Sequence, residues 1–225
     1  MAGDEAGEVY HYYRMEVDQA ICELIQYYQW LGEEDSWNLW EGGWRTELWY
    51  TPKDGEPQKY LVENVINSGL VEEEKLVFAD VDYDGTEEIL VGRGHFGNRG
   101  YLFYACYFQR EGTLQFCESF SEIRNPCLDR EKKAILSCWT QSGAGYVWSF
   151  YEYQEQSFVE TRRLTVIFRP LDDGFELCTV EILQNDQMET IHQWQGNECS
   201  YERLEELFFN EGNDWALHTD RWEYI

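Results

Sequence analysis

The pattern of apolar and polar positions changes near residue 75. Before that point, from Glu8 to Leu31, apolar residues recur every three or four positions, the period of an amphipathic helix, and Gly32 follows as an end signal. These residues are Tyr10, Tyr13, Val17, Ile21, Leu24, Tyr28 and Leu31. The spacing predicts an N-terminal amphipathic helix.

The next segment, "SWNLWEGGWRTELWYTPKDGEPQKYLVENVI", has the highest density of aromatic rings in the chain. Its Gly-Gly and Pro-Lys-Asp-Gly-Glu-Pro runs are turn signals, which predicts short strands or a hairpin. We therefore expect residues 1–74 to form a helix and a Trp-rich segment that pack on a main domain of residues 75–225.

From Leu76 onward, β-branched and aromatic runs alternate with turns, a pattern typical of an antiparallel sheet. Two stretches beginning at Ile89 and Ile135 share the order strand, glycine turn, aromatic strand, polar turn and strand, with a period of about 45 residues. A third unit begins at "FELCTVEIL", and "SYERLEELFF" predicts a short C-terminal helix. The expected fold is mainly β (α+β), with antiparallel propeller-like repeats.

An acidic turn lies at the start of this region, in "KLVFADVDYDGTEEILVG". We call residues 80–88 the acidic loop. Alternating carboxylates around a glycine turn bring hard oxygen ligands to one point, as Ca²⁺ requires. The expected ligands are Asp80, Asp82, Asp84, Thr86 through its carbonyl, and Glu88. Position 12 is Val91 and strands flank the loop, so an EF-hand is not expected; the alternative is an acidic hairpin without an ion.

The formal net charge is -27, from 17 basic and 44 acidic residues. Such a charge repels phosphates and anionic lipid surfaces and attracts basic proteins, which argues against nucleic-acid binding. No apolar window is long enough to predict membrane insertion. The chain also holds 10 Trp, 16 Tyr and 12 Phe, more than a core of this size needs, so some rings are expected at a partner surface. Our candidates are Trp37, Trp40, Trp44 and Trp49.

The cysteines bear on the compartment. There are seven, with no C-x-x-C spacing, and free thiols in a reducing compartment explain an odd count most simply. The beginning, "MAGDEAGEVYHYY", has neither the basic nor the apolar part of a signal peptide. We predict a cytoplasmic protein; the alternative is an exported protein whose signal or lipoprotein leader is absent from this chain.

Catalytic patterns are few. The four histidines are scattered without zinc-ligand spacing, and no Gly-x-Ser-x-Gly motif is present. The run "GRGHFG" matches a dinucleotide fingerprint in letters, but the β-like "YLFYACYF" follows it where a helix is needed. No catalytic residue is predicted, and we expect a protein that is not an enzyme.

Four segments together carry a family resemblance: "FADVDYDGTEEILV", "GYLFYACYF", "EIRNPCLDREKKAILS" and "GYVWSFYEY". They resemble a bacterial family of β-propeller-like proteins with a single calcium loop, related to FG-GAP/VCBS repeats, over roughly residues 75–165. The resemblance implies that Asp80, Asp82, Asp84 and Glu88 are calcium ligands. It also implies a non-enzymatic protein, and some members of the family are immunity proteins that plug the active site of a lysozyme-like antibacterial effector.

These observations lead to one functional expectation. It is an acidic binding protein that takes up calcium and neutralises a basic partner, a bacterial toxin or enzyme. The alternative is a carbohydrate-binding surface lipoprotein with its leader removed. The N-terminal segment and the cysteine content depart from the family pattern, and neither the partner nor the oligomeric state follows from the sequence.

Overall fold

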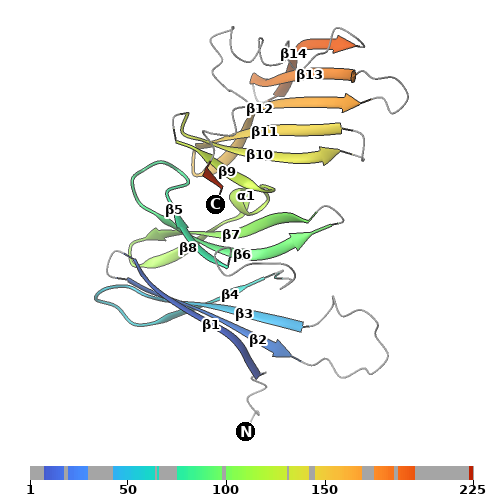
Figure 1. Cartoon of the computed structure of the whole chain (residues 1–225). Coiled ribbons are helices and arrows are strands. Elements are labelled where there is room, and N and C mark those ends of the chain that lie inside the picture. Colours follow the sequence, from blue (N-terminus) through green and yellow to red (C-terminus); the bar gives the residue numbers. More distant parts are fainter. Residues whose placement is uncertain are drawn as a thin grey trace, which may run out of the picture. The chain divides into compact units, whose positions relative to one another are not determined.

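A computed structural model gives the fold (Figure 1). It describes residues 8–17, 20–29, 43–63, 65, 75–97, 100–130, 132–141, 145–168, 175–184, 187–195 and 223–224. The chain divides into two compact units. The first unit comprises residues 1–79 and 87–122, and the second comprises residues 80–86 and 123–225.

The first unit contains two four-stranded antiparallel sheets, each with its strands in sequence order. One sheet consists of β1 (Glu8–Val17), β2 (Ala20–Gln29), β3 (Gly43–Thr51) and β4 (Gln58–Val62). The other consists of β5 (Leu76–Ala79), β6 (Glu88–Phe96), β7 (Tyr101–Arg110) and β8 (Thr113–Cys117), and the short helix α1 (Glu118–Ser121) follows it.

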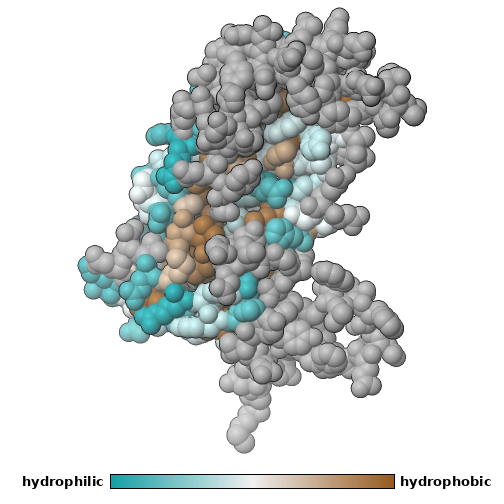
Figure 2. All heavy atoms as spheres, viewed as in Figure 1, coloured by the Kyte–Doolittle hydropathy of each residue, from teal (hydrophilic) through white to brown (hydrophobic). Residues whose placement is uncertain are grey.

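The two sheets of the first unit share one hydrophobic core. Leu24 and Leu48 of the first sheet and Ile89 and Val91 of the second are fully buried in the same cluster. Polar contacts also join the sheets, such as the bond of 2.7 Å that Lys75 Nζ donates to the Tyr13 hydroxyl. On the face shown in Figure 2, hydrophobic residues gather between hydrophilic ones where Figure 1 draws β5, β7 and β8.

The second unit contains a seven-stranded antiparallel sheet in the order β14-β13-β12-β11-β10-β9-β15. Its strands are β9 (Pro126–Asp129), β10 (Ala134–Gln141), β11 (Gly145–Gln154), β12 (Ser157–Phe168), β13 (Phe175–Gln184), β14 (Gln187–Gln195) and β15 (Glu223–Tyr224). Strands β9 to β14 follow one another as neighbours, and β15 pairs with β9. Leu136, Phe150 and Leu164 are among its fully buried residues.

The prediction of an N-terminal amphipathic helix is wrong. Residues 8–29 form the antiparallel pair β1 and β2, closed by the partners Val17 and Ala20. Along β2, Cys22, Leu24 and Gln26 are buried while the residues between them are only half-buried, which is the two-residue period of a strand. The sequence did not show this two-residue period, because apolar residues lie on both faces of the hairpin and the polar Gln26 occupies a buried position. The apolar residues therefore had the spacing of a helix.

The prediction of a mainly β, antiparallel fold is confirmed. The two similar stretches of sequence correspond to the three-strand meanders β6-β7-β8 and β10-β11-β12, and "FELCTVEIL" forms β13. In the described residues the sheets are open and no propeller closes. The predicted C-terminal helix lies outside the described residues. No helix within the described ranges is long and apolar enough to cross a membrane.

Candidate functional site

The acidic loop connects β5 to β6. The ladder between these strands ends with Ala79 opposite Glu88, so Glu88 faces the point where the chain enters the loop. Two residues of the loop have positive φ, Tyr83 at 61° and Gly85 at 94°. This left-handed backbone turns the chain within a few residues, so that acids separated along the loop come together.

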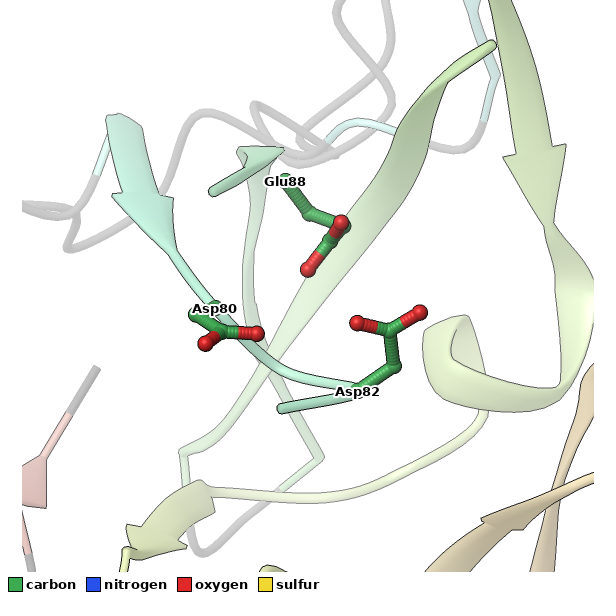
Figure 3. A group of neighbouring side chains, drawn as sticks. All are labelled: Asp80, Asp82 and Glu88. Atoms are coloured by element: carbon green, nitrogen blue, oxygen red, sulfur yellow. The ribbon is translucent and has the colours of Figure 1, made fainter. Parts of the chain in front are cut away.

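Three of the five predicted ligands form one cluster. One carboxylate oxygen from each of Asp80, Asp82 and Glu88 lies within 4.8 Å of the others. Figure 3 shows the three carboxylates directed toward a common space. Among the described residues, this is the one group of three or more acidic, Cys or His side chains placed to hold a metal ion.

Backbone amides fix the orientation of the aspartates. The Gly85 amide donates to Asp80 Oδ2 at 3.1 Å, and the Asp84 amide donates to Asp82 Oδ1 at 3.2 Å. The Asp84 carboxylate accepts a bond of 2.7 Å from the Thr86 amide, and Asp84 is not part of the cluster. These bonds within the loop orient the side chains of Asp80, Asp82 and Asp84.

A side chain that the sequence analysis did not single out also positions the loop. Tyr83 lies between the clustered aspartates and Gly85, and its hydroxyl donates to the Ala134 carbonyl oxygen at 2.7 Å. Burial raises the pKa of this phenol far above its usual value, so Tyr83 stays protonated and keeps donating at any physiological pH. A turn residue of type Tyr carries no sequence signal for such a bond, because Ala134 is 51 residues away.

The donor set suits a hard divalent cation. Asp80 Oδ1 is buried and has no hydrogen-bond partner among the described residues. Glu88 is completely buried beside two other carboxylates, and like charges this close repel one another. Carboxylate oxygens are the ligands that Ca²⁺ prefers, with about six to eight needed in total. Asp80, Asp82 and Glu88 would hold the ion, and backbone carbonyls such as that of Thr86 are the natural source of further ligands.

Of the four tryptophans predicted to form a partner surface, the structure describes the side chain of Trp49. Trp37 and Trp40 lie outside the described residues, and for Trp44 the structure gives only the backbone pairing with Tyr28. Trp49 is half-buried on β3, where Leu48 and Tyr50 on either side of it belong to the core.

Polar neighbours surround Trp49 on the face away from the core. The indole Nε1 donates to Glu47 Oε2 at 3.1 Å, and Lys59 Nζ lies 5.5 Å from the ring centroid. Glu47 also forms ion pairs with Arg45 at 2.5 Å and Lys59 at 3.5 Å. Part of the Trp49 ring is therefore available to a partner, within a network of charged side chains.

The other candidate chemistry adds no second site within the described residues. Cys22, Cys106, Cys117, Cys127 and Cys138 are free thiols, and most are buried. The "GRGHFG" run lies at the end of β6, and the next element is the strand β7, as the sequence predicts for a non-nucleotide loop.

No protein-family model matches this chain, and no curated protein matches it. A solved structure of a protein from Xanthomonas, described as related to a type IV secretion system, is similar in fold. The match has a TM-score of 0.56 and 18% sequence identity, and it covers 80% of this chain and 93% of the other. At this identity the likeness concerns the fold.

Proposed function

We propose that this protein is a non-enzymatic, acidic binding protein that neutralises a bacterial toxin or enzyme and that holds calcium in its acidic loop. The observation that carries the calcium part is the convergence of Asp80, Asp82 and Glu88 within 4.8 Å. The ion neutralises carboxylates that otherwise repel one another and fixes the β5–β6 connection. The role is structural, and it needs no closure of the sheets into a propeller.

The charge of the chain supports a protein partner of basic character. The net charge of -27 accelerates the encounter with a positively charged protein over distances beyond direct contact. The fold is similar to that of a Xanthomonas protein described as related to a type IV secretion system. A basic toxin fits the charge of this chain, and it is the partner that the proposal names.

The calcium part is tested by thermal unfolding in excess calcium and in excess EGTA. An ion present at about 100 times its Kd stabilises the folded state by roughly 2.7 kcal/mol, which for this chain length is a Tm increase of roughly 5–10 °C. Asp82→Ala should abolish the difference between the two conditions. Asp54→Ala is the control, because Asp54 is exposed on the β3–β4 connection, and it should retain the difference. Identical curves for the unmodified protein refute calcium binding.

The neutralisation part is tested with the partner itself. The tagged protein is purified from its source cells, the specifically bound protein is identified, and the activity of that protein is measured with increasing amounts of this one. We expect complete inhibition near equimolar ratio. A captured toxin that keeps its full activity at excess inhibitor contradicts the proposal.

A second candidate function has one observation in its favour. Tyr146 and Trp148 stand two positions apart on β11, with ring centroids 5.8 Å apart and planes inclined by 31°. Tyr146 is exposed and Trp148 is half-buried, and the accessible face of an aromatic ring can stack on a sugar. Glycan-array binding that Tyr146→Ala removes, together with no specific protein partner, would favour the carbohydrate-binding alternative.

A further inference from the structure

A cavity of about 610 Å³ lies within the first unit and does not include the acidic loop. Residues of β4, β6, β7, β8 and the short helix α1 line it. Its volume falls within the range of about 300–1,000 Å³ that is usual for ligand sites. It is therefore large enough for a side chain of a partner protein together with part of the backbone that carries it.

One wall of the cavity is aromatic. The Tyr60 and Tyr107 ring centroids are 6.1 Å apart, and those of Tyr107 and Phe116 are 5.5 Å apart, so three rings follow one another along the wall. At the rim, Leu61 is 59% exposed and Phe116 is 50% exposed. Two large apolar side chains in water beside a cavity are typical of a surface that a partner covers.

Three carboxylates border the same cavity. Glu63, Glu118 and Glu122 are exposed, and none of them forms an ion pair or a side-chain hydrogen bond with another described residue. Burial raises the pKa of the Tyr107 phenol to about 12, with Arg93 opposing the increase and Glu63 adding to it. Glu63 lines the same cavity as the Tyr107 ring, so its carboxylate borders the aromatic wall.

The two cations of the lining are engaged elsewhere. Lys59 Nζ pairs with Glu47 at 3.5 Å and lies over the Trp49 ring. Arg93 Nη1 donates to the Ser121 carbonyl oxygen at 3.2 Å, and its guanidinium lies 5.8 Å from the Phe96 centroid. Three carboxylates against two cations leave the lining with a net negative charge, and Lys59 is also paired with Glu47.

We propose that this cavity receives an arginine side chain presented by the basic partner of this protein. The aliphatic stem packs against Leu61 and Phe116, the guanidinium lies over the aromatic wall, and Glu118 and Glu122 pair with it at the rim. Aromatic rings and carboxylates together favour arginine, because its planar cation stacks on a ring while it donates to carboxylates. The inference rests on the proposed function, since it names what the partner presents.

Other occupants fit less well. An anionic group would have to approach three carboxylates to reach Arg93, whose Nε is buried. A purely apolar side chain would use the rings and would leave the glutamates without a role. Both possibilities make different predictions for the same experiment.

The experiment is a titration of the isotope-labelled full chain, followed by ¹H–¹⁵N NMR. The probes are three capped tripeptides, acetyl-Gly-Arg-Gly-amide and its counterparts with norleucine and glutamate in place of arginine. The arginine peptide should give saturable shifts at Leu61, Tyr107 and Phe116. It should bind about 5-fold or more tightly than the norleucine peptide, the effect of roughly one ion pair.

A pair of double variants separates the site from general electrostatics. Glu118→Gln with Glu122→Gln should weaken arginine binding about 5-fold or more. Asp54→Asn with Glu56→Gln removes the same charge from exposed positions outside the cavity and should leave the affinity unchanged. All four positions are exposed, and the spectra themselves report whether each variant is folded.

Three results would overturn the proposal: equal affinity for norleucine, preference for glutamate, or equal weakening by both double variants. Measurements of arginine binding and of toxin inhibition test the cavity proposal and the proposed function separately. If toxin inhibition persists while the arginine peptide does not bind, another surface carries inhibition. If the peptide binds as expected and no toxin is inhibited, the cavity remains an arginine site and the neutralising role falls.

Discussion

Among individual residues, the acidic loop depends most on those with positive φ. Gly85 has φ of 94°, a conformation that costs an L-residue roughly 1–2 kcal/mol, and an added Cβ there would meet nothing within 4 Å. Tyr83 adopts φ of 61° despite its bulk, and the hydrogen bond from its hydroxyl to Ala134 offsets part of that cost. Backbone conformation and one distant contact together place the carboxylates.

The substitution Gly85→Ala should therefore strain the backbone without creating a steric clash. We expect a loss of about 1–2 kcal/mol in the free energy of unfolding and a weaker affinity for calcium, because the Gly85 amide also orients Asp80. Urea denaturation and calorimetric titration with calcium measure the two effects. Gly112→Ala is the matched control: Gly112 has φ of 77° in open space on the β7–β8 turn. It should lose similar stability and keep calcium affinity, so equal affinities for the two variants would show that Gly85 has no special role.

At the scale of secondary-structure elements, local signals predicted some features and could not predict others. The cluster of acidic side chains in the loop was predictable because Asp80, Asp82 and Glu88 are within nine residues of one another and local chain geometry brings them together. The cavity could not be predicted from the sequence, because its lining comes from separate parts of the chain, in β4, β6, β7 and β8. The β1–β2 hairpin was missed because Ile21 and Leu24 lie on opposite faces of a strand yet are spaced like neighbours on a helix.

The strand assignment of β2 can be tested through its core position. Leu24 is completely buried between the two sheets of the first unit, so Leu24→Ala should cost about 2–5 kcal/mol in the free energy of unfolding. Leu61→Ala makes the same chemical change at a position that is 59% exposed, and it should cost less than about 0.5 kcal/mol. Chemical denaturation of both variants gives the comparison. Equal losses would contradict the inward position of Leu24 on β2.

For the chain as a whole, charge is the dominant feature. Acidic residues outnumber basic ones 44 to 17, and the described ion pairs engage only a few of the acids. Self-repulsion on this scale opposes the compact state, while the same charge would favour capture of the basic partner that we propose. We therefore expect added salt to stabilise the fold and to weaken binding of that partner.

Added sodium chloride should stabilise this protein. Raising the salt from about 20 mM to about 500 mM shortens the Debye length to roughly 4 Å, which screens repulsion among surface carboxylates. If this screening adds about 1–2 kcal/mol to the free energy of unfolding, the Tm should rise by roughly 3–6 °C. Scanning calorimetry in EGTA separates this effect from calcium binding, and a salt of a large cation, tetramethylammonium chloride, tests for ion-specific sites. If only sodium raises the Tm, specific binding is responsible and general self-repulsion is not the cause.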